Sequence, residues 1–136
     1  MRYLGLDLGK KSLGIAISDK LGIVASFYKN IKFENELESI PILKDIIEKE
    51  KIEKIVLGLP KNMDNSLGFR VEETKNYKEL LEKKFNMEVI LEDERLSTKL
   101  AESVLIDADL SRKKRKKVID GVSAVVILQS YLDRKE

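Results

Sequence analysis

The N-terminal segment of the chain, residues 2–18, is RYLGLDLGKKSLGIAIS. Its apolar stretches 2–8 and 13–18 are separated by the short polar turn 9–11, which is typical of two neighbouring strands. A second turn follows, and residues 23–31 continue as a third strand. The segment therefore predicts an antiparallel three-stranded meander at the start of the chain.

Helices and strands alternate in the remainder of the chain. Apolar residues recur every three or four positions between Glu36 and Glu50, as on one face of an amphipathic helix. The predicted elements are helix 36–50, strand 53–59, helix 69–85, strand 88–92, helix 98–106 and helix 112–132. A meander followed by strand–helix alternation indicates an α/β fold with a mixed sheet and helices on its faces. The length of 136 residues suits a single domain, residues 1–136.

The sequence contains no cysteine and no histidine. This excludes disulfides, zinc sites built on Cys or His, and Ser-His-Asp triads. Carboxylates remain as metal ligands, and sites made only of carboxylates favour Mg²⁺ or Mn²⁺. No stretch approaches the roughly 18 apolar residues of a membrane span, and the early charges of the N-terminus do not fit a signal peptide. We therefore expect a cytoplasmic protein with no membrane partner.

The charge is nearly balanced overall but unevenly distributed. The chain has 26 basic and 24 acidic residues, and six of the basic residues form the run RKKRKK at 112–117. Without this run, 20 basic residues stand against 24 acidic ones. A local block of this kind indicates either a solvated helix start or a surface that contacts phosphate.

Asp7 lies near the end of the first predicted strand, between Leu6 and Leu8. Ligands of α/β sheets usually bind at the carboxyl ends of the strands, which makes Asp7 a candidate metal ligand. The alternative is a carboxylate that caps the turn at Gly9.

Asp93, Glu94 and Arg95 follow the apolar strand 88–92. Adjacent carboxylates repel each other unless a cation neutralises them, and a bound metal does so. Because side chains alternate along a strand, only one of the two acids is expected to face the site. Arg95 could contact phosphate or one of the acids. The alternative is a solvated loop with a local salt bridge.

Asp120 lies in the last predicted helix. The residues expected to form the apolar face of this helix are Val118, Val122, Val125, Val126 and Leu132. Asp120 is expected on the far side, beside Ala124 and Ile127. A charge on a helix that is apolar nearly all round is costly unless it is paired or binds a metal. Pairing with Lys116 or Lys117 is the alternative, although a lysine that precedes its acid is the poorer orientation.

Two acids at strand ends and one on a helix fit a two-metal site for phosphodiester hydrolysis. The basic run lies one to two turns before Asp120, so Lys113 and Lys116 are expected to hold a nucleic-acid backbone near the metals. The polar loop 60–68, with Arg70, either binds substrate or turns the chain.

Four motifs occur in order along nearly the whole chain. They are Asp7-Leu-Gly9 with Gly14-Ile-Ala16, Gly58-Leu-Pro60 with Asn62 and Asp64, Asp93-Glu94-Arg95-Leu-Ser97-Thr98, and Ile119-Asp120-Gly with Gln129 and Tyr131. The first motif alone also resembles the phosphate loop of actin/hexokinase-type ATPases, but those need two such domains and this chain is long enough for one. Together the four motifs resemble the YqgF/RuvX family, described as Holliday-junction-resolvase-like proteins and as pre-16S rRNA nucleases.

The resemblance implies a ribonuclease H-like fold. Its five-stranded mixed sheet would have the order 3-2-1-4-5, with strand 2 antiparallel and helices on both sides. The resemblance also implies that Asp7, Glu94 and Asp120 are the catalytic, metal-binding acids, with Glu94 rather than Asp93 as the ligand. The family usually has an arginine where this chain has Ser12, so Lys10 or Lys11 is expected to replace it on the phosphate.

The resulting hypothesis is a metal-dependent endonuclease that processes the 5′ end of pre-16S rRNA in ribosome biogenesis, with the pre-ribosomal particle as a further partner. One alternative is a Holliday junction resolvase that acts on branched DNA, which requires a two-fold dimer. The other is a non-catalytic nucleic-acid-binding module. The sequence is compatible with a monomer or a homodimer.

Overall fold

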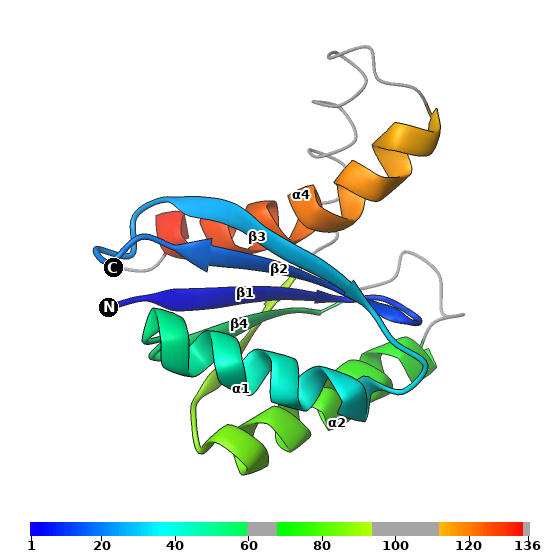
Figure 1. Cartoon of the computed structure of the whole chain (residues 1–136), viewed down its shortest axis with the longest axis horizontal. Helices are drawn as coiled ribbons and strands as arrows, with labels where there is room; N and C mark the ends of the chain where they lie inside the picture. Colours follow the sequence, from blue (N-terminus) through cyan, green and yellow to red (C-terminus); the bar gives the residue numbers. More distant parts are fainter. Residues whose placement is uncertain (60–67, 94–111, 135–136) are drawn as a thin grey trace.

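Figure 1 shows the computed structural model of the chain, which describes residues 1–59, 68–93 and 112–134. Its elements, in chain order, are β1 (Tyr3–Leu8), β2 (Ser12–Ser18), β3 (Ala25–Lys32), the 3₁₀ helix η1 (Glu36–Glu38), α1 (Ser39–Glu50), β4 (Lys54–Leu59), α2 (Gly68–Phe85), β5 (Val89–Asp93) and α4 (Arg112–Arg134). The predicted helix 98–106 lies outside the described residues.

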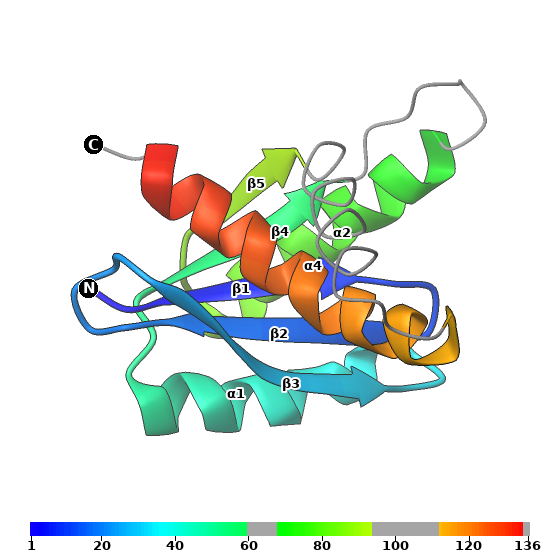
Figure 2. The same ribbon diagram turned by 90° about the horizontal axis from the view of Figure 1, so that it is seen from above.

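The five strands form one mixed sheet in the order β3-β2-β1-β4-β5. Strand β2 runs antiparallel to both β1 and β3, whereas β1, β4 and β5 are parallel. The α/β fold and the strand order 3-2-1-4-5 with strand 2 antiparallel are thus confirmed. Helices α1 and α2 cover one face of the sheet, and α4 crosses the other face diagonally (Figures 1 and 2).

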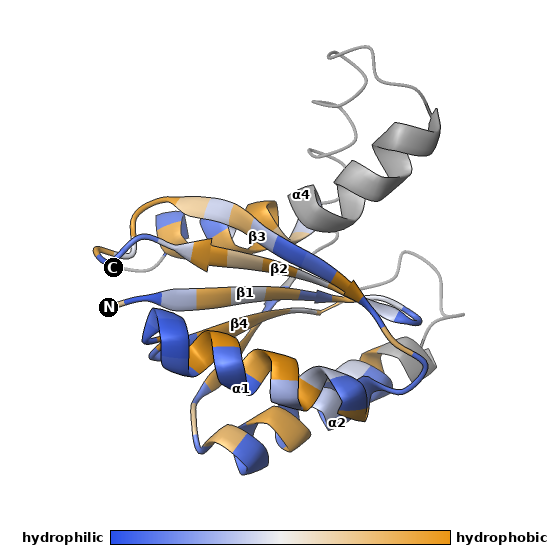
Figure 3. Ribbon diagram, in the orientation of Figure 1, coloured by the Kyte–Doolittle hydropathy of each residue, from blue (hydrophilic) through white to orange (hydrophobic). Residues whose placement is uncertain are grey.

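The side chains of β1 divide between two apolar cores. Leu4 and Leu6 are fully buried in the core on the side of α1 and α2. Tyr3 belongs to the core beneath α4, and a Cβ built on Gly5 would point at Leu128 of α4. Because both faces of the sheet are covered, its central strands are largely hydrophobic (Figure 3), as is usual for buried parallel strands.

Strand β3 and helix α1 begin later than predicted because side chains bind backbone groups in the segments before them. The third strand begins at Ala25 rather than at 23, since Asp19 Oδ1 accepts hydrogen bonds from the backbone N–H groups of Ile23 (2.7 Å) and Val24 (3.0 Å) and holds them in the turn. The predicted helix 36–50 begins as the 3₁₀ turn η1, where Asn35 and Glu38 form a capping box.

The predicted apolar face of the last helix is confirmed at Leu132 but not at Val126, and the side chains of Val118 and Val122 lie outside the described part. The described residues of α4 that are buried on the sheet are Ser123, Ala124, Ile127, Leu128 and Leu132, whereas Val125 and Val126 are only partly buried. The helix approaches β1 closely at Gly5, where an added Cβ would lie 2.6 Å from Leu128 Cβ. None of the helices in the described ranges is long and apolar enough to span a bilayer.

Gly5→Ala should displace α4 from β1, because the new Cβ would also lie 3.1 Å from the backbone oxygen of Ala124. We expect a loss of about 1–3 kcal/mol in the free energy of unfolding, as for other overpacked cores, measured by urea denaturation. Gly9→Ala is the control, because its Cβ approaches only Ser12 Oγ closely, and this short side chain can rotate. Equal losses in the two variants would contradict the close packing at Gly5.

Asp19→Asn should reveal a carboxylate that stabilises the fold by its charge. The backbone N–H groups of Val24 and Ile23 lower the pKa of Asp19 below its ordinary value of 3.8. A lowered folded-state pKa contributes stability that is present above pH 3.8 and is lost as the pH falls through the folded value. The Tm difference between the wild type and the variant should therefore be full at pH 6 and shrink below pH 3.8. A difference that stays constant down to pH 3 would argue against this role.

Candidate functional site

Asp7 lies in the second half of β1, one residue before its end. Leu6, its neighbour, is buried on the side of α1 and α2, so the alternation of side chains places Asp7 on the face that α4 covers. The residue is only partly buried, unlike the four residues before it in the strand. Asp7 is therefore a carboxylate on the α4 face, toward the carboxyl end of a central strand.

The residues beside Asp7 on the neighbouring strands are glycines. Gly14 of β2 is its antiparallel partner. The parallel register that pairs Leu6 with Leu57 places Gly58 of β4 on its other side. Neither neighbouring residue in the sheet presents a side chain beside Asp7. Glycines at such positions typically allow a ligand or another backbone to approach closely.

The same row across the sheet ends in polar residues on both sides. Asn30 of β3 pairs with Gly14, and Glu92 of β5 pairs with Gly58. The Oδ1 atom of Asn30 is buried and has no hydrogen-bond partner in the described part of the chain. A buried acceptor of this kind needs a donor or a cation to satisfy it. The row around Asp7 is thus polar, in a sheet whose other rows are mainly apolar.

The register between β1 and α4 relates the backbone of α4 to the position of Asp7. Along β1, Tyr3 contacts Tyr131 with ring centroids 5.7 Å apart, and Gly5 faces Leu128 and Ala124. Moving from Tyr3 toward Asp7 therefore means moving back along α4. Two strand residues advance about 6.6 Å, and one helical turn rises about 5.4 Å. The next turn back from Ala124 is that of Asp120, four residues earlier on the same helix face.

The remaining predicted site residues fall as follows. Lys10 and Lys11 are exposed in the turn between β1 and β2, and Lys11 forms an ion pair with Glu34 at 3.3 Å. The backbones of Arg70, Lys113, Lys116 and Asp120 lie in helices, but their side chains lie outside the described part, as do Glu94 and Arg95 entirely. Among the described residues no group of three metal-ligating side chains occurs. The side chains of two of the three predicted acids, Glu94 and Asp120, lie outside the described part.

The turn after Asp7 is closed by its own backbone. The N–H of Gly9 donates to the carbonyl oxygen of Ser12 at 2.8 Å, and the N–H of Phe33 donates to the carbonyl oxygen of Lys11 at 3.0 Å. The family that the sequence resembles usually has an arginine at the position of Ser12. In this chain the carbonyl oxygen of Ser12 helps to close the turn. The lysines of this turn stand at the same end of β1 as Asp7.

Glu92 is a charged residue that the sequence analysis did not single out. It is buried, with 6% of its surface exposed, and faces α4. Its Oε2 accepts a hydrogen bond from Ser130 Oγ at 3.0 Å, and its Oε1 pairs with the guanidinium of Arg134. This pairing raises the pKa of Arg134. The signal in the sequence was a glutamate directly after the apolar residues 89–91 of the strand. Position 92 lies on the side of β5 that faces α4.

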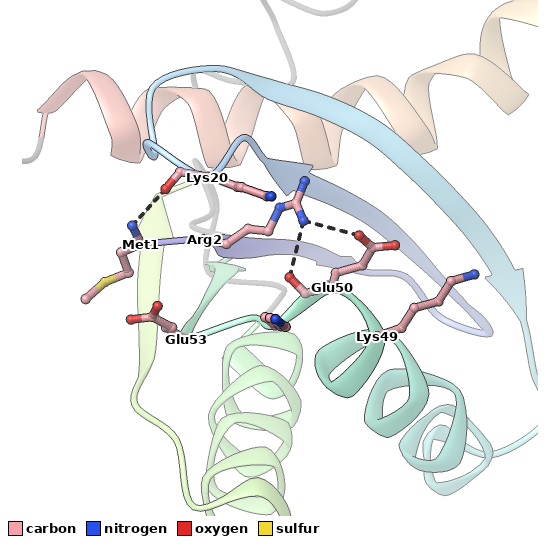
Figure 4. Close-up of a pocket in the computed structure, with 7 residues that line it drawn as sticks. Met1, Arg2, Lys20, Lys49, Glu50 and Glu53 are labelled. Atoms are coloured by element: carbon pink, nitrogen blue, oxygen red, sulfur yellow. Dashed lines mark hydrogen bonds and ion pairs between the residues drawn. The ribbon is translucent and has the colours of Figure 1, made fainter.

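A hollow of about 460 Å³ lies at the opposite end of β1 (Figure 4). It is lined by Met1, Arg2, Lys20, Lys49, Glu50, Lys51 and Glu53. The guanidinium of Arg2 donates to the carboxylate and to the carbonyl oxygen of Glu50, both at 3.3 Å. These contacts join β1 to the end of α1. The hollow mixes both signs of charge and lies far from Asp7 along the strand, so we assign the candidate site to the Asp7 end.

Comparison with known proteins shows the family to which the chain belongs. The family model described as "RuvX: Holliday junction resolvase" matches residues 1–134. A relative from Geobacillus sp. (strain WCH70), named "Putative pre-16S rRNA nuclease", is 51% identical over the full length of both chains. A relative of the same name from Listeria monocytogenes serotype 4b (strain CLIP80459) is 49% identical over 98% of both.

The solved structure of T. thermophilus RuvC in complex with a Holliday junction substrate has the same fold. It superposes with a TM-score of 0.63 at 13% identity, covering 97% of this chain and 94% of that one. With the family match over residues 1–134 and relatives near 50% identity, this chain belongs to the RuvX family of nucleases.

Proposed function

We propose that this chain is a metal-dependent endonuclease that hydrolyses phosphodiester bonds of pre-16S rRNA, at the 5′ end of the molecule, during assembly of the small ribosomal subunit in the cytoplasm. Residues 1–136 would act as one nuclease domain. The observation that carries the proposal is the register between β1 and α4, which brings the turn of Asp120 toward Asp7. The names of the Geobacillus and Listeria relatives support the substrate.

The donor set fits Mg²⁺ or Mn²⁺. The chain has no histidine or cysteine, so carboxylates and water are the ligands it offers, and hard cations prefer these oxygen ligands. The glycines beside Asp7 present no side chains on this face of the sheet. In the same row, the Oδ1 atom of Asn30, which has no hydrogen-bond partner in the described part, adds polarity. A bound divalent ion would activate water for attack on phosphorus and stabilise the leaving oxygen.

Asp7, Glu94 and Asp120 would hold the metal through their carboxylates. Glu94 is preferred over Asp93 because the resemblance to the family implies it as the ligand. Lys10, Lys11, Arg70, Arg95, Lys113 and Lys116 would bind phosphates on either side of the scissile bond. Their role is to hold the RNA backbone against the three acids.

A Holliday junction resolvase is the second candidate, favoured by the fold shared with T. thermophilus RuvC. Such an enzyme must cut two strands symmetrically, which requires a two-fold dimer. Light scattering on the purified protein separates the two functions. A strict monomer that cleaves pre-16S rRNA supports the first, and a stable dimer that cleaves four-way junctions supports the second.

Asp7→Asn should abolish cleavage, because the amide keeps the shape of the side chain but removes the charge that binds the metal. We expect a loss of at least about 10²-fold in kcat on a pre-16S rRNA 5′ fragment with Mg²⁺ or Mn²⁺. Asp45→Asn, on the exposed side of α1 and across the sheet from α4, is the matched control and should cleave at the wild-type rate.

Wild-type cleavage by Asp7→Asn would defeat the catalytic assignment. If neither the wild type nor the variant cleaves RNA or junction DNA while both bind RNA, the protein is a binding module, and the proposal fails.

Replacing Lys113 and Lys116 together by alanine should weaken RNA binding without changing the rate at saturating RNA. Each lost phosphate contact on a single strand lowers the slope of log K against log salt by about 0.7, so the double variant should lose about 1.4. Fluorescence anisotropy between 50 and 200 mM KCl measures this slope. An unchanged slope would show that these lysines do not contact phosphate.

A further inference from the structure

Strand β5 is held on the α4 side by few contacts. It is an edge strand, hydrogen-bonded to β4 alone in the described sheet. The buried core beneath α4 takes its strand residues from the other four strands, namely Tyr3, Ala16, Ala25 and Val56. No buried residue of β5 belongs to this core in the described ranges. Packing of apolar side chains therefore does little to fix β5 relative to α4.

Glu92 supplies the missing connection. Both of its carboxylate oxygens are engaged by the last turns of α4, Oε2 by Ser130 and Oε1 by Arg134. Ser130 and Arg134 are four residues apart, so they present their side chains from one face of the helix. Arg134 also lies over the ring of Tyr131, 5.8 Å from its centroid. Tyr131 in turn packs on Tyr3 of β1, which ties the ion pair to the central strand.

The C-terminal part of α4 is also attached to the connection between β2 and β3. Gln129 Oε1 accepts a hydrogen bond from the N–H of Ala25, and its Nε2 donates to the carbonyl oxygen of Ile23, both at 2.8 Å. The end of α4 is thus attached to the β2–β3 connection on one side and to Glu92 of β5 on the other. Glu92 thus ties β5, which is hydrogen-bonded to β4, directly to the helix.

The location of this pair matters for the proposed site. Glu92 lies in the same row of the sheet as Asp7, separated from it by Gly58. Two strand spacings put the two Cα atoms about 10 Å apart. Glu94 follows two residues later, and Asp120 belongs to the helix that Glu92 binds. Glu94 thus follows β5 in the sequence and Asp120 belongs to α4, and the ion pair of Glu92 and Arg134 joins β5 to α4.

We propose that the cluster of Glu92, Ser130 and Arg134 is a positioning device for the proposed metal site, which fixes the end of β5 relative to α4. This inference rests on the proposed function. Glu92 does not itself bind the metal, because both its oxygens are occupied by Ser130 and Arg134. Only the carboxylate of the ion pair is buried, since the side chain of Arg134 is 62% exposed, and an ion pair with an exposed partner adds little net stability. A role in fixing geometry therefore accounts better for its presence.

The test compares Glu92→Gln and Arg134→Met with a control pair, Glu88→Gln and Lys54→Met. Lys54 of β4 and Glu88, just before β5, form an ion pair at 3.2 Å at the other end of these strands, so the control also removes one basic and one acidic charge, but away from α4. Mn²⁺ binding to each variant, without RNA, is measured by electron paramagnetic resonance titration. Tm is measured in parallel, and KM and kcat for RNA are measured at saturating Mn²⁺.

We expect both test variants to bind Mn²⁺ about tenfold more weakly, as is usual when a group that orients a metal ligand is lost. The KM for RNA should stay unchanged, and the control variants should bind Mn²⁺ as the wild type does. Wild-type Mn²⁺ affinity in both test variants, even with a lower Tm, would overturn the inference and leave a structural ion pair. Asp7→Asn separates this failure from that of the site itself, because wild-type Mn²⁺ binding by that variant would remove the proposed metal site altogether.

Discussion

The close contact between β1 and α4 at Gly5 is the constraint on which the rest of the site depends. A hydrogen atom instead of a side chain at this position allows Leu128 and the backbone of Ala124 to lie directly on the strand. This contact sets the register of the helix along β1, with Tyr131 over Tyr3 and the turn of Asp120 toward Asp7. A larger residue at position 5 would lift the helix from the strand that carries Asp7.

The strands were predictable because their signals are local, whereas their order followed from the family resemblance. Alternating and continuous apolar stretches gave β1, β2, β4 and β5 within one residue at each end. The start of β3 was missed because one Asp19 oxygen holds two backbone N–H groups in the preceding turn, and that hydrogen bonding follows from a conformation that apolar patterning does not report. The 3₁₀ turn before α1 has the same origin in the capping box of Asn35.

The site was predictable in part. Asp7 was found from its place at the end of a central strand, and its α4-side location follows from the buried leucines beside it. The buried face of α4 was predicted only in part, because hydrophobicity favours valine over alanine and serine. The residues that the close approach of α4 to Gly5 buries are Ala124 and Leu128. Glu92 was missed because its partners lie 38 and 42 residues away in sequence.

The central claim is that Asp7 and Asp120 share a cation on the α4 face of the sheet. Anomalous diffraction from crystals grown with Mn²⁺ tests it most directly. The account predicts a manganese peak within coordination distance, about 2.0–2.3 Å, of carboxylate oxygens from both residues. Manganese bound elsewhere, for example in the hollow near Glu50 and Glu53, with the Asp7 and Asp120 carboxylates apart, would contradict it.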